Sequence, residues 1–258
     1  MKVILNGARG KMGSEIWKML EEGKRGMEIA AGIDPAADGS DPRILKSFSD
    51  YRGKADVIID FSHHACTAAL MDFAERQGLP CVVATTGQTG PELERIHAAA
   101  ERIPIFRSAN MSLGVALLAD FARRAAALLP EADIEIVEKH HNTKLDAPSG
   151  TALMLANEIK KTRTDACFVC GRYGQRLRSK NEIGIHALRM GGVIGEHEVI
   201  LAGATETLSL KHEAHSRVLF ADGALAAAEF IAGCPAGLYD MHDLIEKKTG
   251  AGKEGPLC

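Results

Sequence analysis

Apolar residues in the first hundred positions alternate between short continuous runs and longer stretches with helical spacing. Residues 2–6 and 55–60 are continuous runs, which are typical of strands buried on both faces of a parallel sheet. Between 11 and 22, Met12, Ile16 and Leu20 recur at the spacing of one helix face. Further strands are expected at 28–33, 80–84 and 103–106, and further helices at 65–77 and 91–102. This alternation predicts an α/β fold with a doubly wound parallel sheet.

The pattern changes after about residue 111. Helices are expected at 112–129 and 149–161, with a strand at 133–139 between them. Three strand-like runs between 183 and 211 have no helix between them, which predicts antiparallel pairing. Residues 217–232 return to a helical pattern. We therefore expect one domain made of 1–111 plus 217–258, with an α+β domain, 112–216, inserted into it.

Composition narrows the possible classes of protein. The chain has 258 residues, 46% hydrophobic and 25% charged, with a net charge of −3, so no general basic field attracts nucleic acid or anionic membranes. The apolar run at the start stops at Gly7 after four residues, which is short for a signal peptide, and no run approaches a membrane span. A cytoplasmic protein without nucleic-acid or membrane partners is expected.

Six cysteines are present, of which Cys167 and Cys170 form a single CxxC. A CxxC is either redox-active, half of a metal site, or simply two thiols. No second CxxC or suitably spaced Cys/His pair completes a set of four ligands. We expect free thiols and no metal.

Gly7, Gly10 and Gly13 form a GxxGxxG between the first strand and the first helix, and Asp34 ends the second strand. Such a turn brings backbone N–H groups and a helix N-terminus close to a pyrophosphate, and a carboxylate at Asp34 accepts hydrogen bonds from a ribose diol. The order of these features predicts a Rossmann-type dinucleotide site. The alternative is a strand–helix turn that merely uses glycine, with Asp34 as a solvated loop residue.

The charges around this turn bear on the choice of nucleotide. Asp34 repels a 2′-phosphate, while Arg9 and Lys11 attract it. The balance favours NADH, with NADPH tolerated. Two more loops follow strand ends, where ligands bind in open α/β sheets: they are Ala84–Thr86 and Ser108–Met111.

The densest group of reactive side chains lies between 138 and 152. His140, His141 and Lys144 place several proton donors in one loop, and Ser149 begins the next expected helix. A helix N-terminus there suits a carboxylate, so the loop fits a dianionic small molecule. Paired histidines also bind zinc, but no nearby ligand has the usual spacing. Ser149 lacks the G-x-S-x-G context of a nucleophile, and a helix cap is the better interpretation.

The run HHNTKLDAPSGTA at 140–152 resembles the signature of the dihydrodipicolinate reductase family. The resemblance extends along nearly the whole chain. It includes GARGKMG from 7, DFS from 60, ATTG from 84, SANMSLGV from 108, RMGGVIGEH from 189, HSRVLFADGA from 215 and GLYDM from 237. The family reduces the cyclic product of aspartate semialdehyde and pyruvate to tetrahydrodipicolinate, on the route to diaminopimelate and lysine.

The resemblance implies roles for individual residues. His140 is the proton donor and acceptor, Lys144 a second proton donor, and His141, Gly150 and Thr151 contact the substrate carboxylates. The dinucleotide is held by Gly7, Ala8, Arg9, Gly10, Lys11, Met12, Asp34, Ala84, Thr85, Thr86, Ser108, Ala109, Asn110 and Met111. The family is a homotetramer whose second domain supplies the subunit contacts through its sheet.

The chain departs from the family at two positions. Ala84 stands where many members have glycine, and Pro35 where some have an arginine that grips the 2′-phosphate. The second departure agrees with the preference for NADH. Two rival interpretations stay open: a related dehydrogenase of an amino acid or homoserine, which would not need the 140–152 motif, and an NAD(H)-sensing regulator without catalysis. An absorbance assay at 340 nm separates an enzyme from a sensor.

Overall fold

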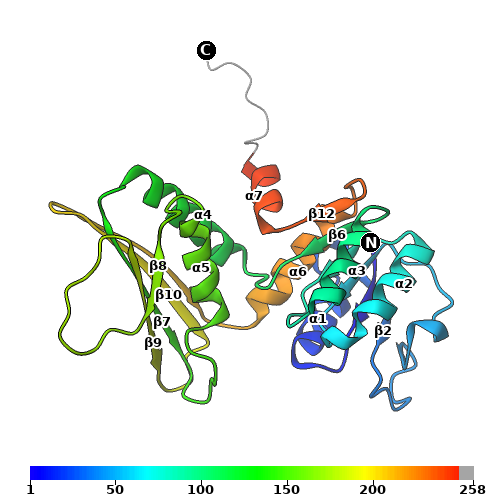
Figure 1. Cartoon of the computed structure of the whole chain (residues 1–258). Helices are drawn as coiled ribbons and strands as arrows, with labels where there is room; N and C mark the ends of the chain where they lie inside the picture. Colours follow the sequence, from blue (N-terminus) through cyan, green and yellow to red (C-terminus); the bar gives the residue numbers. More distant parts are fainter. Residues whose placement is uncertain (250–258) are drawn as a thin grey trace. The chain divides into compact units, whose positions relative to one another are not determined.

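The computed structural model describes residues 1–249, and the chain forms two compact units (Figure 1). The first unit contains residues 1–111 and the described residues from Val218 onward, and the second contains Ser112–Arg217. The chain thus leaves the first unit after Met111 and returns to it after Arg217. No described helix is both long and apolar enough to span a bilayer.

The first unit is built on a seven-stranded parallel sheet in the order β12-β6-β5-β4-β1-β2-β3. Its strands are β1 (Lys2–Asn6), β2 (Glu28–Ile33), β3 (Ile44–Leu45), β4 (Val57–Asp60), β5 (Cys81–Val83), β6 (Pro104–Arg107) and β12 (Gly237–Tyr239). Chain order reverses at β1, because β2 and β3 continue on one side and β4 to β6 on the other. This reversal creates the crevice in which ligands bind in open α/β folds. The predicted Rossmann-type sheet is confirmed.

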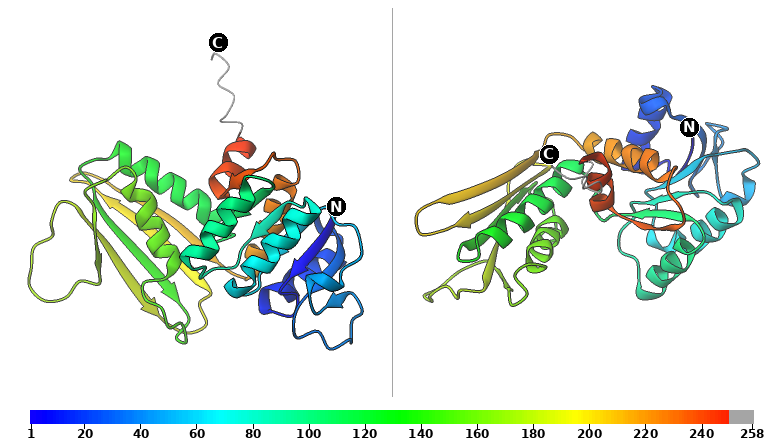
Figure 2. Two further views of the ribbon diagram at one scale, coloured as in Figure 1. Left: turned by 45° about the vertical axis from the view of Figure 1, so that its right-hand side comes forward. Right: turned by 90° about the horizontal axis from the view of Figure 1, so that it is seen from above.

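Helices cover both faces of this sheet (Figure 2). They are α1 (Lys11–Glu21), α2 (Thr67–Gln77), α3 (Gly90–Ala100), α6 (Val218–Ile231) and α7 (Met241–Thr249), with short 3₁₀ turns at Lys24–Gly26, Phe48–Asp50 and His64–Cys66. Leu70 of α2 and Ile96 of α3 pack against Ile4 and Ile58 on one face. α1 and α6 pack against each other and the sheet, and Gly223 brings α6 close to Met111, whose carbonyl oxygen would lie 1.7 Å from an added Cβ.

The second unit has one five-stranded mixed sheet in the order β11-β10-β7-β9-β8, with both of its helices on one face (Figure 1). The elements are α4 (Leu113–Leu128), β7 (Asp133–His140), α5 (Gly150–Lys160), β8 (Cys167–Cys170), β9 (Glu182–Arg189), β10 (Gly195–Ala202) and β11 (Thr207–Ala214). Ile136 and Val199 point toward the helices and pack against Leu118 and Leu155. The α+β organisation predicted for this part of the chain is confirmed.

The expected antiparallel pairing of the three strands between 183 and 211 is correct only for β10 with β11. β9 does not pair with β10. Instead, β9 pairs in parallel with β7 and β8, and β10 pairs with the other edge of β7. The end of β7, at His140, therefore lies between Arg189 and Gly195. Neighbours in sequence are often neighbours in a sheet, but β7 has the apolar alternation of a central strand and occupies this position.

Candidate active site

The residues predicted to bind a dinucleotide all follow carboxyl ends of strands in the first unit. Gly7–Met12 join β1 to α1, and Asp34 follows β2. Ala84–Thr86 follow β5, and Ser108–Met111 follow β6. Because these strands are parallel, the four segments lie along one edge of the sheet, on both sides of the point where strand order reverses.

The glycine turn has the close packing that a dinucleotide site requires. Gly7 has φ of +82°, and a Cβ there would lie 2.4 Å from the carbonyl oxygen of Phe61. A Cβ on Gly13 would lie 2.0 Å from the carbonyl oxygen of Gly7. α1 begins without a side-chain cap and without an acidic residue in its first turn. Its first N–H groups and its dipole therefore suit a diphosphate, and these residues fit a nicotinamide dinucleotide.

Asp34 is held against the glycine turn. Its carboxylate accepts hydrogen bonds from the backbone N–H groups of Arg9 and Ala36, each at 2.9 Å. The Arg9 guanidinium turns away to Asp38, at 2.5 Å, and to Ser40. Hydrogen bonds from Ser40, together with the Arg9 charge, lower the pKa of Asp38 to about 2. Arg9 is thus already paired with a carboxylate in the loop after Asp34.

A buried polar cluster at the end of β4 is one that the sequence prediction did not assign. Asp60 is 2% exposed and accepts hydrogen bonds from the Asn6 amide, at 2.7 Å, and from the Ser62 hydroxyl, at 2.6 Å. Burial raises the pKa of Asp60, although these hydrogen bonds oppose the shift. The cluster fixes the ends of β1 and β4 beside the glycine turn. The sequence signal that could have revealed this cluster is the polar residue that ends each of the two apolar runs, Asn6 in the first and Asp60 in the second.

In the second unit, the predicted catalytic residue His140 is the last residue of β7, and its side chain is only 10% exposed. Its Nδ1 lies 2.5 Å from Oε2 of Glu138, two residues earlier on the same face of the strand. A Cβ on Gly195 of β10 would lie 3.1 Å from His140 Nε2. The glycine therefore leaves room beside the nitrogen that Glu138 does not hold.

Glu138 has a fully buried carboxylate that joins three parts of the unit. Both of its oxygens accept hydrogen bonds from Arg189 of β9, at 2.8 and 2.9 Å, and Oε1 also accepts one from the Ser149 backbone N–H at 3.0 Å. Burial by itself would raise the pKa of Glu138, but the hydrogen bonds from Arg189, His140 and Ser149 outweigh it and lower the pKa. Glu138 and Arg189 had no role in the sequence prediction. The i, i+2 spacing of Glu138 and His140 in a strand was the available signal.

The loop after His140 carries the other predicted catalytic side chain. Lys144 is 21% exposed, and its ammonium donates to Asp146 at 2.7 Å. His141 Nδ1 lies 2.7 Å from the Thr143 hydroxyl. Arg189 also donates to the Asp146 carbonyl oxygen, so the residue that holds Glu138 also fixes this loop.

The first turn of α5 brings the predicted substrate-binding residues Gly150 and Thr151 next to this group. The Ser149 hydroxyl accepts a hydrogen bond from the Ala152 N–H at 3.2 Å, which confirms its interpretation as a helix cap. The same hydroxyl lies 3.1 Å from His197 Nε2. Burial, followed by the positive charges of His140 and other neighbours including Lys144, lowers the pKa of His197 to about 4. His197 is thus a neutral residue next to the predicted catalytic pair, and its role was missed in the sequence.

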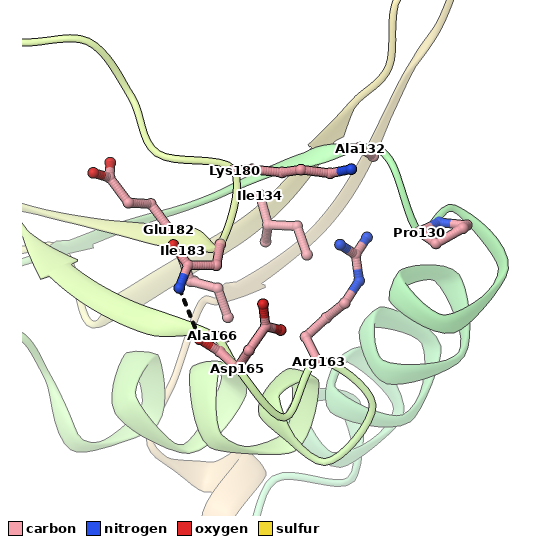
Figure 3. Close-up of a pocket in the computed structure, with 10 residues that line it drawn as sticks. Pro130, Ala132, Ile134, Arg163, Asp165, Ala166, Lys180, Glu182 and Ile183 are labelled. Carbon is pink, nitrogen blue, oxygen red and sulfur yellow. Dashed lines mark hydrogen bonds between the residues drawn. The ribbon is translucent and has the colours of Figure 1, made fainter.

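Two features of the second unit lie apart from this group. A cavity of about 370 Å³ opens near the start of β7, lined by Ile134, Arg163 and Lys180 among others (Figure 3). Ile134 lies six residues before His140 on one strand, roughly 20 Å away. The Cys167 and Cys170 thiols of β8 are free, and their i, i+3 spacing places them on opposite faces of the strand. Among residues 1–249, no three potential ligands are grouped as a metal site.

Comparison with known families gives matches over both units. Residues 1–111 match the family described as dihydrodipicolinate reductase, N-terminus, and residues 114–245 match dihydrodipicolinate reductase, C-terminus. The 4-hydroxy-tetrahydrodipicolinate reductase of Caldanaerobacter subterraneus is 45% identical over 249 residues, covering 96% of this chain and 99% of the relative. The enzyme of the same name from Clostridium novyi is 46% identical over 251 residues, with 96% and 99% coverage.

Solved structures agree with this assignment. A dipicolinate-bound dihydrodipicolinate reductase from Paenisporosarcina sp. TG-14 superposes with a TM-score of 0.80 and 26% identity, covering 93% of this chain and 97% of that one. An amine dehydrogenase from Mycobacterium smegmatis has a TM-score of 0.63 at 11% identity, with 92% and 94% coverage, a likeness of fold alone. The matches along both units show that the chain belongs to the dihydrodipicolinate reductase family.

Proposed function

We propose that the protein reduces 4-hydroxy-tetrahydrodipicolinate, or its dehydrated form dihydrodipicolinate, to tetrahydrodipicolinate with NAD(P)H, in the biosynthesis of diaminopimelate and lysine. The observation that carries this proposal is the group at the end of β7. A buried carboxylate holds His140, the Lys144 loop follows it, and the first turn of α5 lies beside them. Relatives 45–46% identical over nearly the whole chain have the name of this activity.

The residues of the second unit have complementary chemical tasks in this proposal. Reduced nicotinamide, when bound, supplies the hydride. His140 Nε2 then provides the proton that the reduced ring needs, and Lys144 is a second proton donor whose charge stabilises negative charge developing on the ring. Substrate carboxylates meet the N-terminus of α5 at Gly150 and Thr151, with His141 beside them.

We assign NADH as the preferred nucleotide, with NADPH tolerated. Asp34 is hydrogen-bonded to the glycine turn, where the ribose of the dinucleotide would bind. The Arg9 guanidinium is paired with Asp38 and is therefore not free to bind a phosphate. Both features disfavour a 2′-phosphate. The predicted cofactor contacts of the four loops rest on their shared position at the strand ends and on the resemblance to the family.

A cytoplasmic homotetramer remains our expectation for the assembled protein. Within the described second unit, α4 and α5 both pack on the face of the sheet that contains Ile136. The other face presents Val137 and Lys139 of β7 and Ile200 of β10, all partly exposed. This face supports the subunit contacts proposed for the family, and sedimentation equilibrium of the purified protein tests the tetramer.

The activity is tested by following absorbance at 340 nm with freshly condensed pyruvate and aspartate semialdehyde, supplied with NADH or NADPH in turn. We expect rapid oxidation of both nucleotides, with a higher kcat/KM for NADH. Oxidation that starts only after both carbon substrates are present identifies the condensed product as the acceptor. Absence of oxidation by a folded protein that binds NADH would contradict the proposed reaction.

A further inference from the structure

We propose that Glu138 is a positioning residue of this active site. Its carboxylate fixes the tautomer of His140, directs Nε2 away from itself, and stabilises the protonated imidazole that donates the proton. This inference rests on the proposed function, since it concerns how the same reaction is supported. It assigns tasks to Glu138 and to its partner Arg189, which touch neither substrate nor nucleotide in this scheme.

The first step of the argument is that every acceptor position of the Glu138 carboxylate is filled. Oε1 accepts from the Ser149 N–H and from Arg189, and Oε2 accepts from His140 and from Arg189. A carboxylate has about four lone-pair sites, and four donors occupy them here. The side chain is 0% exposed. It therefore cannot rotate without breaking several charge-assisted hydrogen bonds at once, and it acts as a rigid support.

The second step concerns protonation. Arg189 is always charged, and its bidentate contact keeps Glu138 ionised. An ionised carboxylate only accepts hydrogen bonds, so the His140 Nδ1 at 2.5 Å must carry the proton. Nε2 of the neutral ring then carries none. Only the doubly protonated ring has an Nε2–H to donate, and a neighbouring carboxylate stabilises that cation.

The third step is the charge of the surroundings. Around His140 lie Glu138 on its own strand, Arg189 on β9, neutral His197 on β10, and the Lys144–Asp146 pair in the following loop. His197 meets His140 edge to face, with ring centroids 5.2 Å apart. Burial lowers the pKa of His197 to about 4, so His197 is neutral at higher pH and adds no second positive charge beside His140. Glu138 is thus the only negative group hydrogen-bonded to the His140 ring within the described structure.

The consequence is a balanced proton-transfer step. The hydride delivers two electrons and one hydrogen to the substrate ring, and the N–H bond at His140 Nε2 breaks as its proton passes to the resulting anion. The imidazole is left neutral with its Nδ1–H still held by Glu138, and it regains a proton from solvent. Without Glu138, the neutral ring can adopt the other tautomer and the cation loses its counter-charge.

The test compares Glu138→Gln with the wild type. We expect kcat at pH 8 to fall about 10²–10⁴-fold, the range for a lost general acid or a histidine held in the wrong tautomer, while KM changes less than about threefold. The high-pH limb of the kcat profile should move about 1–2 units toward acid, because the cation has lost an opposite charge in contact with it. Glu138→Asp keeps the negative charge, so its high-pH limb should lie closer to that of the wild type. An unshifted profile with a wild-type kcat would overturn the proposal.

The matched control is Glu182→Gln. Glu182 of β9 is also a buried carboxylate, 2% exposed, with two arginine partners, Arg172 and Arg176. It lies seven residues before Arg189 on the same strand, roughly 23 Å away. Its replacement should lower thermal stability without moving the pH profile. A similar shift in both variants would show that loss of any buried carboxylate is sufficient, which would refute a specific role for Glu138.

A second measurement is made on the wild-type protein and needs no turnover. ¹⁵N spectra of wild-type protein with labelled histidines report which ring nitrogens are protonated, with His140 assigned by signals lost in His140→Gln. At pH 8 we expect Nδ1–H for His140. The opposite tautomer would overturn the positioning role even if the protein is an active reductase. The expected tautomer in a protein without reductase activity would instead support the positioning role and reject the proposed function.

Discussion

At the scale of single residues, the proposed chemistry depends on two side chains: His140 at the end of β7 and Lys144 in the loop that follows it. His140→Ala or Lys144→Ala should lower kcat by about 10²–10⁴-fold, because in the proposed mechanism each removes a proton donor and a positive charge that acts on the substrate ring. Initial rates at 340 nm over a range of substrate concentrations measure the effect. Lys161→Ala is the control, since this lysine also pairs with a carboxylate, at 2.6 Å, but at the far end of α5. Near wild-type kcat in both loop variants would refute the catalytic assignment.

Asp34 provides a test of nucleotide choice at the same scale. Asp34→Ala removes the charge that opposes a 2′-phosphate, so the NADPH/NADH ratio of kcat/KM should rise about tenfold, equivalent to about 1.4 kcal/mol of lost repulsion. Asp41→Ala is the control, because the Asp41 carboxylate pairs with Arg43 in the neighbouring loop and has no hydrogen bond to the glycine turn among residues 1–249. Rates with both nucleotides give the ratio directly. If it stays constant in Asp34→Ala, another residue discriminates between the nucleotides.

The sequence predicted some of these residues and missed others for physical reasons. The glycine turn and Asp34 could be placed because their spacing is local and a strand and helix frame them. His140 and Lys144 came from one continuous motif. Arg189 is 51 residues from Glu138, and only the pairing of β7 with β9 brings them together. His197 reaches the group through β10 in the same way. Contacts that depend on strand register leave no local pattern to detect.

At the scale of elements, the substrate site proposed at the start of α5 would couple helix stability to substrate binding. The Ser149 hydroxyl caps the helix and also lies 3.1 Å from His197 Nε2. Ser149→Ala should lower the free energy of unfolding by about 1–2 kcal/mol, because a helix cap is lost. It should also raise KM more than it lowers kcat if the first turn receives the substrate carboxylates as proposed. Urea unfolding and steady-state kinetics measure the two effects. Ser112→Ala, at the cap of α4, controls for loss of a cap elsewhere.

Most helices and strands were predicted because their apolar spacing is strong, and the exceptions are short or irregular. β3 has two residues and β12 has three, too few for a period to appear. β8 reads CFVC, with partly exposed residues that resemble a loop. Strand order in the second unit was the larger error. Hydrophobic patterning identifies which residues of β9 and β10 are buried, but it does not say which strand lies between them.

At the scale of the whole molecule, buried ionisable groups make folding sensitive to acid. His197 is 4% exposed, and burial, with positive neighbours, lowers its pKa from 6.5 to about 4. Between these values the unfolded chain binds a proton that the folded chain does not, so stability falls as pH falls, by up to about 3 kcal/mol. Glu182 affects folding stability over a lower range of pH. Arg172 lowers its pKa from 4.5 to about 2, so its contribution is present above 4.5 and is lost as pH falls toward 2.

These two windows predict a thermal midpoint that declines in two stages as pH is lowered from 7.5. His197→Leu should make the decline between pH 6.5 and 4.5 clearly shallower, whatever its effect at neutral pH, because no titrating group is then buried at that position. Part of the decline should remain, since burial also lowers the pKa of His212. His242→Leu, which changes a half-exposed histidine of α7, should keep the full decline. Differential scanning calorimetry at half-unit pH steps measures both slopes. If His197→Leu loses stability with acid as steeply as the wild type in this range, a different group controls the first stage, and the neutral state assigned to His197 beside His140 is wrong.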